Sequence, residues 1–331
     1  MLGIILLLIV NQPQEGKTAA SKEDLRREYV TKGMTAYTEE DYRNAIGFFK
    51  GAFEIDTTYA ALSYNIACCY SLLNLKDSAI IWVKRTVELG TYEFEEDKDF
   101  DNIRDMKEFK RIALRSKELL KEAKKRKWES LIFIPPDYDS SQKYPLFIVL
   151  HGYGSSPSDF TRELPIFLTE KGFIFLIPYG TEVHGLTSFS WGDVDKCEEK
   201  ILKDIEEVKS KYSIDTTRII LLGYSQGGSR TFSLGVRNPE VFKAIITVAG
   251  TFNEEEVKDY LNKLKGKDFR LYMMIGGKDR KERIKSNEMA KRLLKQYGAK
   301  VHLEIYPEVG HAFPGDPLKE VGKALKFIMG E

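Results

Sequence analysis

The chain has little cysteine, little histidine and almost no net charge. Its three cysteines are Cys68, Cys69 and Cys197, and because two are adjacent they supply neither a disulfide framework nor the spacing of a zinc site. The 51 basic residues are balanced by 50 acidic ones, so the net charge of +1 removes the long-range attraction that nucleic-acid-binding proteins usually have. We therefore expect no metal, no cofactor and no nucleic-acid partner.

The amino-terminal apolar run, residues 2–10, is too short to span a bilayer but has the length of a signal-peptide core. No Lys or Arg precedes the run, and the nearest cleavage candidate, residues 18–20, lies far downstream. A misassigned start or a disordered tail is the alternative. We expect residues 1–24 to be an apolar segment and linker, interpreted as a signal peptide, which favours a secreted or periplasmic protein over a cytoplasmic one.

The length of 331 residues suggests two domains, at about 150 residues per domain. Residues 25–89 carry helical periodicity and repeat themselves at an offset of 34, and we expect a helical repeat domain over residues 25–128. At that offset small residues fall on small ones and large apolar residues on large apolar ones, namely Gly33 on Ala67, Ala45 on Ala79, Ile46 on Ile80 and Phe49 on Val83. Antiparallel helix pairs need small residues at close approaches and bulky ones beside them.

Residues 41–52 resemble the second helix of a tetratricopeptide repeat, and residues 60–90 resemble another repeat. The spacing of Phe100, Ile103, Phe109 and Ile112 predicts an apolar helical face that closes the stack as a cap. Such stacks bind peptides in a concave groove, but two repeats give only a short groove. We expect the repeats to pack on the following domain, with an outside protein or peptide partner as the alternative.

From residue 129 onward, short β-rich runs alternate with amphipathic helical segments, which predicts a doubly wound, mostly parallel sheet with helices on both faces. The predicted strands are 131–134, 146–150, 173–177, 219–222, 244–248, 271–275 and 301–305. The predicted helices are 158–171, 196–212, 226–237, 254–265, 281–298 and 317–329. Residues 129–331 are thus an α/β domain, and its functional groups should gather at the carboxyl ends of the strands.

A G-x-S-x-G motif centred on Ser225 follows the strand at 219–222 and precedes a helix. In this strand–turn–helix context the serine sits on a sharp turn with its hydroxyl above the sheet, which predicts a nucleophile. Gly223 and Gly227 remove side chains that would collide with neighbouring elements. The alternative is a glycine-rich turn with an idle serine.

A serine hydroxyl needs a base, and four histidines are available. His302 lies inside a strand, His184 precedes the serine in an irregular loop, and His151 ends an early strand. His311 follows the last strand, where the chain order Ser, Asp, His places the base. Asp279, after the strand at 271–275, is the expected acid that orients the imidazole, with a helix N-cap as its alternative role.

An oxyanion hole needs two fixed N–H donors aimed at the developing charge. One is expected from the backbone of Gln226, directly after the serine. The loop His151-Gly152-Tyr153-Gly154 is expected to supply the other, from the N–H of Tyr153. A plain glycine turn is the alternative.

Four motifs occur in order: H-G-x-G at 151–154, G-x-S-Q-G-G at 223–228, G-G-x-D at 276–279 and G-H-x-F at 310–313. With them, residues 129–331 resemble an α/β-hydrolase of the phospholipase/carboxylesterase and dienelactone-hydrolase type. The resemblance implies an esterase of class 3.1.1, with Ser225 attacking, His311 moving the proton and Asp279 orienting it. Trp191 resembles a tryptophan found after the third strand in such esterases.

Four aromatic residues are expected to line the substrate pocket, with core packing as the alternative for each: Tyr153, Phe160, Trp191 and Phe313. The interval 179–195 is too short for a helical lid, so we expect an open site that accepts small or moderately sized esters. Two other functions stay open. One is a serine peptidase of the prolyl-oligopeptidase type, and the other is a non-catalytic scaffold that binds peptides through its helical repeats.

Overall fold

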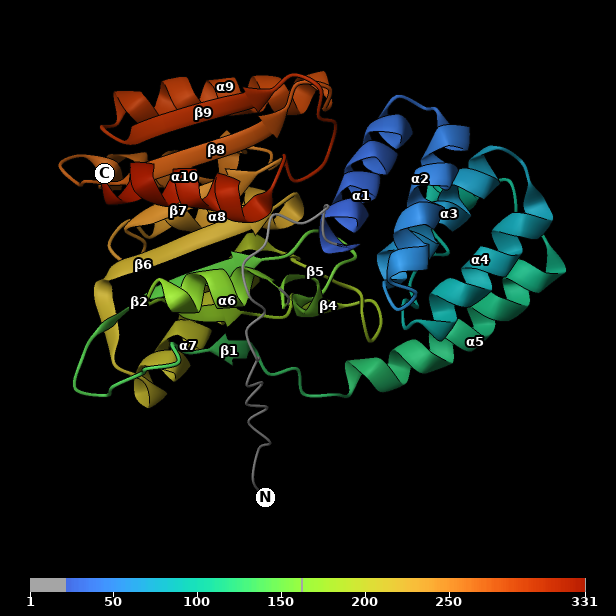
Figure 1. The fold of residues 1–331 in the computed structure, drawn as a ribbon, viewed down its shortest axis with the longest axis horizontal. Helices are drawn as coiled ribbons and strands as arrows, with labels where there is room; N and C mark the ends of the chain where they lie inside the picture. The colour runs from blue at the N-terminus through green and yellow to red at the C-terminus, as the bar shows by residue number, and fades with distance from the viewer. Residues whose placement is uncertain (1–21, 162, 331) are drawn as a thin grey trace.

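The computed structural model describes residues 22–161 and 163–330, in two parts that lie side by side (Figure 1). An all-helical region comes first, and an α/β region built on a seven-stranded sheet follows. The predicted amino-terminal apolar segment falls almost wholly outside the described residues. No helix in the described ranges combines the length and the apolarity that crossing a membrane requires.

Five α-helices build the helical region: α1 (Lys22–Thr38), α2 (Tyr42–Ile55), α3 (Ala60–Leu72), α4 (Lys76–Glu88) and α5 (Lys107–Lys124). Each packs against the next along the chain. The small residues of the 34-residue offset lie where helices approach closely. Ala45, Ala67 and Ala79 are fully buried, and a Cβ at Gly33 would lie 2.5 Å from the Phe49 ring. Large side chains at these positions would separate the helices.

The prediction that Phe100, Ile103, Phe109 and Ile112 share one helical face is wrong. Phe100 ends the short 3-10 helix η1 (Lys98–Phe100), Ile103 lies in the turn after it, and only Phe109 and Ile112 belong to α5. All four side chains are buried in one cluster with residues of α3 and α4. They close the stack from three segments of chain, because a turn can bury apolar side chains as well as a helix face can.

The sheet has the order β1-β3-β2-β6-β7-β8-β9, and every neighbouring pair is parallel except β1 with β3. Its strands are β1 (Leu131–Phe133), β2 (Tyr144–Leu150), β3 (Ile174–Ile177), β6 (Ile214–Tyr224), β7 (Ala244–Val248), β8 (Arg270–Gly276) and β9 (Lys300–Tyr306). Strands β2, β3 and β7 are buried along their whole length, as strands covered on both faces must be. The predicted doubly wound, mostly parallel sheet is confirmed.

Helices cover both faces of this sheet. One face carries α7 (Val194–Lys211), α8 (Gln226–Arg237) and α9 (Lys281–Gln296), and the other carries α6 (Glu163–Glu170) and α10 (Pro317–Met329). The segment predicted as a helix at 254–265 instead forms two 3-10 helices, η3 (Glu254–Glu256) and η4 (Lys258–Leu264). The predicted helix at 158–171 is divided into a 3-10 helix, η2 (Pro157–Phe160), and α6.

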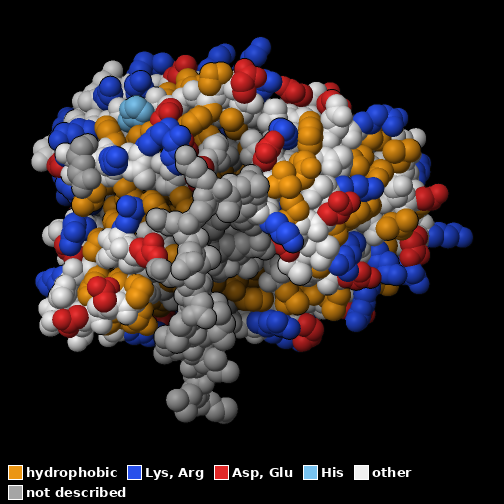
Figure 2. Space-filling model, in the orientation of Figure 1, with side chains coloured by type: hydrophobic (Ala, Val, Ile, Leu, Met, Phe, Trp, Pro, Cys, Tyr) orange, Lys and Arg blue, Asp and Glu red, His pale blue; other side chains and the backbone are white. Residues whose placement is uncertain are grey.

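The helical region is joined to the α/β region by backbone hydrogen bonds. The carbonyl of Gly90 accepts from the N–H of Leu186 at 2.6 Å, and the carbonyl of His184 accepts from Tyr92 at 2.8 Å and Glu93 at 3.0 Å. Residues 184–187 belong to a small hairpin formed by β4 (Glu182–Val183) and β5 (Phe189–Ser190). On the face drawn in Figure 2, basic and acidic side chains are interspersed, as the balanced composition predicts.

Candidate active site

Ser225 sits on a strained turn between β6 and α8. Its backbone has φ 54° and ψ −116°, a left-handed conformation that non-glycine residues rarely adopt. A Cβ at Gly223 would lie 2.2 Å from the carbonyl oxygen of Gly227, and one at Gly227 would lie 2.3 Å from that of Leu150. Only glycine fits at both positions, so the G-x-S-x-G spacing is dictated by this turn.

The structure brings Ser225, His311 and Asp279 together from three loops at the carboxyl edge of the sheet. Ser225 Oγ lies 2.8 Å from His311 Nε2, and His311 Nδ1 lies 2.8 Å from Asp279 Oδ2. The carboxylate of Asp279 is fully buried and accepts a hydrogen bond from the imidazole. It does not cap the first turn of α9, whose N-cap position belongs to Arg280. This chain of contacts can deprotonate the serine hydroxyl and stabilise the resulting imidazolium.

A fourth side chain, Arg283, reaches the same carboxylate and was missed by the sequence reasoning. Its guanidinium contacts Asp279 Oδ1, and Nη1 lies 2.8 Å from His311 Nδ1. An Nδ1 that faces a carboxylate carries its proton toward that carboxylate, and a guanidinium only donates, so the Arg283–His311 approach is a close contact of two donors. Arg283 stands four residues after Asp279, a spacing that places two side chains on one side of a helical turn.

The pKa of Asp279 is held below its usual range. Burial alone would raise this pKa, but the hydrogen bond and charge of His311, the charge of Arg283 and the N–H of Arg280 together outweigh burial. Asp279 is therefore ionised at neutral pH, which is the state that orients a protonated Nδ1.

The loop expected to form the oxyanion hole lies beside the serine. A Cβ on Gly152 would approach the Cβ of Ser225 to 3.5 Å. Throughout residues 22–161 and 163–330, the backbone N–H groups of Tyr153 and Gln226 donate no hydrogen bond to protein. Gln226 opens α8, where first-turn N–H groups have no intrahelical acceptor.

His151 braces this loop as a neutral imidazole. Burial lowers the pKa of His151 to about 4. One ring nitrogen donates to the carbonyl of Gly152 at 2.8 Å, and the other accepts from the N–H of Gly180 at 3.1 Å. The ring thus has a single tautomer that satisfies both contacts and fixes the backbone next to Tyr153.

Trp191 is not a pocket wall, and that prediction is wrong. Its side chain is fully buried, its ring packs on His151 at 5.0 Å between centroids, and its indole N–H donates to the carbonyl of His151 at 2.8 Å. The backbone N–H of Trp191 also donates to the side-chain carbonyl of Gln226 at 3.0 Å. Trp191 therefore supports Gln226 directly and the loop of Tyr153 through His151.

A cavity of about 330 Å³ opens over Ser225 and His311. Tyr153, Phe160 and Phe313 line it, as the sequence predicts. Residues of α1 and α3 also line this cavity, a contribution of the helical region that the expectation of an open site did not include. Residues 179–193 form the β4–β5 hairpin and no helical lid, and α1 lies beside the α/β region (Figure 1).

The two remaining histidines stand outside this centre. His184 contacts Glu93 and lies 2.7 Å from Ser190 Oγ, so it joins the two regions. His302 stacks on Tyr272 from within β9, at 4.6 Å between ring centroids. Neither lines the cavity over Ser225.

One group of side chains has the spacing of metal ligands. Among the described residues, ligand atoms of Cys68, Asp97 and Asp99 lie within 4.8 Å of one another in the helical region. Each carboxylate already accepts a tyrosine hydroxyl, Asp97 from Tyr64 and Asp99 from Tyr37. The sequence pattern did not indicate that these three residues would meet.

A parallel sheet of this order with a serine elbow defines an α/β-hydrolase fold. The sequence profile of the Phospholipase/Carboxylesterase family matches residues 138–329. The chain therefore belongs to the phospholipase/carboxylesterase family.

Two curated relatives match part of the chain. Dipeptidyl-peptidase 5 of Porphyromonas gingivalis is 28% identical over 142 residues, which cover 38% of this chain and 19% of that protein. Feruloyl esterase B of Thermothelomyces thermophilus is 26% identical over 130 residues, covering 36% of this chain and 43% of that protein. The matches thus span about a fifth of the peptidase and less than half of the esterase.

Two solved structures share the fold. Esterase PE8 aligns with 61% of this chain and 100% of its own, with a TM-score of 0.52 and 21% identity. An uncharacterised protein from Bacillus cereus aligns with 91% of this chain and 97% of its own, with a TM-score of 0.51 and 18% identity. The second alignment is long enough to include part of the helical region as well as the sheet.

Proposed function

We propose that this protein hydrolyses carboxylic esters through an acyl-enzyme formed on Ser225. The observation that carries the proposal is the pair of 2.8 Å contacts that link Ser225 Oγ, His311 and the buried carboxylate of Asp279 at the cavity floor. Membership of the phospholipase/carboxylesterase family supports the same reaction class.

In this mechanism Ser225 Oγ attacks the ester carbonyl while His311 Nε2 takes the hydroxyl proton. The negative charge that forms on the carbonyl oxygen is stabilised by the N–H groups of Tyr153 and Gln226. The C–O bond to the alcohol then breaks, and His311 returns the proton to the departing oxygen. Water repeats the sequence on the acyl-enzyme, giving the carboxylic acid and free Ser225.

We assign residues 25–128 to a tetratricopeptide-repeat-like domain and residues 129–331 to the catalytic domain. The paired helices and the small residues at the 34-residue offset support the first assignment. The helical domain packs on the catalytic domain instead of holding a separate partner, as the hydrogen bonds of Gly90 and His184 favour. This arrangement disfavours the scaffold alternative, in which the helical groove would bind a peptide.

A peptidase activity is the second candidate, favoured by the partial match to dipeptidyl-peptidase 5. The same serine chemistry cleaves amides when a site also binds the peptide chain. A p-nitroanilide of a dipeptide, assayed beside p-nitrophenyl esters, separates the two. We expect ester turnover without amide turnover.

The direct test compares p-nitrophenyl acetate hydrolysis by the wild type, Ser225→Ala and Ser210→Ala. Ser210 lies on the exposed side of α7 and bonds the carbonyl of Glu207, so it is a matched serine control. We expect Ser225→Ala to lose at least about 10³-fold in kcat, because it removes the nucleophile. Ester turnover that survives in Ser225→Ala at the wild-type rate would refute the proposal.

A further inference from the structure

We propose that the helical region forms the specificity wall of the active site, so that α1 and α3 set the size of the apolar group that an accepted ester carries. This inference rests on the proposed ester hydrolysis and deepens it. It assigns a role in substrate selection to the helical region, which lies outside the residues matched by the family profile.

The cavity over Ser225 is built from two regions of the chain. The helical region contributes Val30, Thr31 and Met34 of α1 and Ala61, Leu62 and Asn65 of α3. The catalytic region contributes apolar side chains from its own loops and helices, namely Phe160, Leu164, Phe313 and Leu318. A substrate group that enters the cavity is therefore enclosed between the two regions.

The wall formed by α1 and α3 is continuous with the core of the helical region. Leu62 is 1% exposed, and it belongs to a core cluster against which Met34 packs. The amide Nδ2 of Asn65 lies 3.7 Å from Met34 Sδ, which joins the two helices at the cavity surface. A well-packed core changes shape only at a cost, so this wall fixes the cavity volume.

The base loop is tied to the same helix. The N–H of Gly310, the residue before His311, donates to Thr35 Oγ1 of α1 at 3.1 Å. Glu39, just beyond α1, pairs at 3.2 Å with Lys278, the residue before Asp279. Helix α1 and the residue after it thus contact the loops that carry His311 and Asp279. A change in the wall therefore alters the space available at Ser225.

The size and lining of the cavity indicate the substrate class. A volume of about 330 Å³ lies at the lower end of the roughly 300–1,000 Å³ typical of ligand pockets. Its mostly apolar lining suits an alkyl or aryl group of moderate size. The ester that fits best therefore carries one such group, as either its acyl or its alcohol part.

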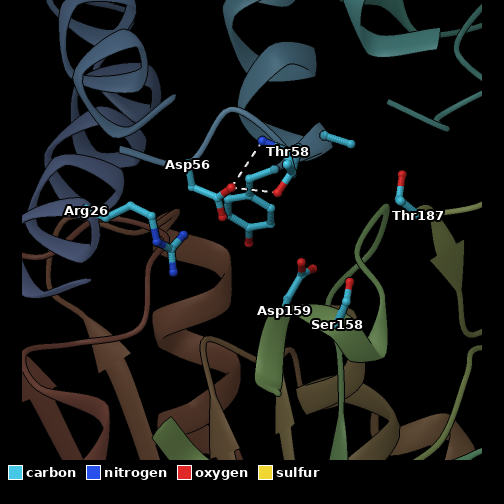
Figure 3. A pocket seen from close by; sticks show the side chains of 9 residues that line it. Arg26, Asp56, Thr58, Ser158, Asp159 and Thr187 are labelled. Carbon is cyan, nitrogen blue, oxygen red and sulfur yellow. Dashed lines mark hydrogen bonds between the residues drawn. The ribbon is translucent and has the colours of Figure 1, made fainter. Parts of the chain in front are cut away.

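A smaller pocket of about 90 Å³, lined by residues of both regions, adjoins the larger cavity (Figure 3). In Figure 3, Arg26 and Asp56 approach from the helical region, and Ser158 and Asp159 from η2. The pocket shares Arg26, Tyr59, Ala61 and Asp159 with the larger cavity, and the first and last of these are charged. Burying an alkyl chain against these charged side chains gains little, so a longer chain finds no apolar continuation there.

The test measures kcat/KM for two substrate series with the full-length protein. One series is p-nitrophenyl esters from acetate to decanoate, and the other is acetate esters of progressively larger alcohols. The variants are Met34→Trp, which fills the cavity, and Met34→Ala, which enlarges it. Leu114→Trp is the matched control, because Leu114 is 66% exposed on α5 and outside the cavity lining.

We expect Met34→Trp to lower kcat/KM for the octanoate ester, or for the corresponding large alcohol, at least about tenfold, since one methylene in a pocket changes kcat/KM about 10–200-fold. Because Met34 lines the cavity, the readout is the ratio of kcat/KM for the octanoate ester to that for the acetate ester. Leu114→Trp should leave this ratio within about twofold of the wild type, and Met34→Ala should move the optimum to longer chains. The series that responds identifies which part of the ester fills the cavity.

Unchanged profiles in both Met34 variants, with the smallest ester still hydrolysed, would overturn the specificity wall while leaving the esterase intact. A response of Leu114→Trp equal to that of Met34→Trp would overturn it as well. If the wild type hydrolyses no ester and Ser225 resists a fluorophosphonate, the proposed function itself fails, and that outcome is separate from the other two.

Discussion

At the scale of single residues, the neighbours of Asp279 keep its carboxylate ionised although it is buried. The carboxylate is fully buried, yet its pKa is lowered, because His311 and Arg283 both contact it. A lowered pKa means that ionised Asp279 stabilises the fold above its unfolded pKa, near 4. This stability is lost as the pH falls through the lower, folded pKa.

Arg283→Leu removes the guanidinium beside Asp279, so the folded pKa of Asp279 should rise toward its ordinary value. We expect a loss of about 1–2 kcal/mol of folding free energy at pH 7, seen as a Tm lower by several degrees. The Tm difference should be smaller at the lowest pH at which the wild type stays folded than at pH 7, because Asp279 loses its charge as the pH falls through its lowered folded pKa. Arg283→Lys, which keeps the charge, is the control, and an equal Tm difference at both pH values would contradict this account.

The structure brings the predicted residues together where the backbone fixes the side chain. Ser225, Asp279 and His311 each follow a strand in one parallel sheet, and parallel strands bring their carboxyl ends to one edge. The role of Trp191 was misjudged because a loop position does not tell which way an indole points. Arg283 was missed because its contact depends on how α9 is turned, which no motif records.

At the scale of elements, one hydrogen bond connects the helical region to the loop that carries the base. Gly310 is buried, and its N–H donates to Thr35 Oγ1. The loop has no regular secondary structure around His311, and this bond to α1 adds to the restraints from the catalytic region, such as the Tyr224 hydroxyl that donates to the His311 carbonyl at 3.1 Å.

Thr35→Val keeps the shape of the side chain and removes the acceptor, leaving a buried N–H without a partner. We expect a loss of about 1–3 kcal/mol in folding free energy, measured by urea denaturation. We also expect kcat to fall about three- to tenfold with little change in KM, because His311 is misplaced while the cavity lining is kept. Thr35→Ser should restore both. A lowered stability with an unchanged kcat would show that the bond is only structural.

The element predictions were most accurate for buried strands. Each run of apolar β-branched residues predicted a strand of the sheet to within a few residues, except at β6, which begins five residues earlier than expected. The segment 254–265 was predicted as one α-helix, but it forms the two 3-10 helices η3 and η4. Spacing alone does not separate the two helix types in a short segment.

At the scale of the whole molecule, the junction between the two regions depends on close backbone contact. Thr91 and Gly185 form a β-bridge, and a Cβ on Gly185 would lie 2.0 Å from the carbonyl oxygen of Gly90. Backbone atoms cannot move away as a side chain can, so a larger residue must separate the junction. Sequence reasoning gave no sign of this contact, because it joins residues far apart in the chain.

Gly185→Ala should lower the free energy of unfolding by about 1–3 kcal/mol, the usual cost of overpacking. Gly47→Ala is the matched control, because an added Cβ on that exposed helical residue meets nothing. The control should be neutral or stabilising by up to about 1 kcal/mol. Equal stability of the two variants in denaturant titrations would contradict a tightly packed junction.

The central claim is that Ser225 is the nucleophile and that His311 activates it. The most direct measurement is the site of covalent labelling by a fluorophosphonate, located by mass spectrometry of the digested protein. We predict one label per chain on Ser225, formed at least about 10²-fold more slowly in His311→Ala. A label on another residue, or no label in a protein that still hydrolyses esters, would contradict the account.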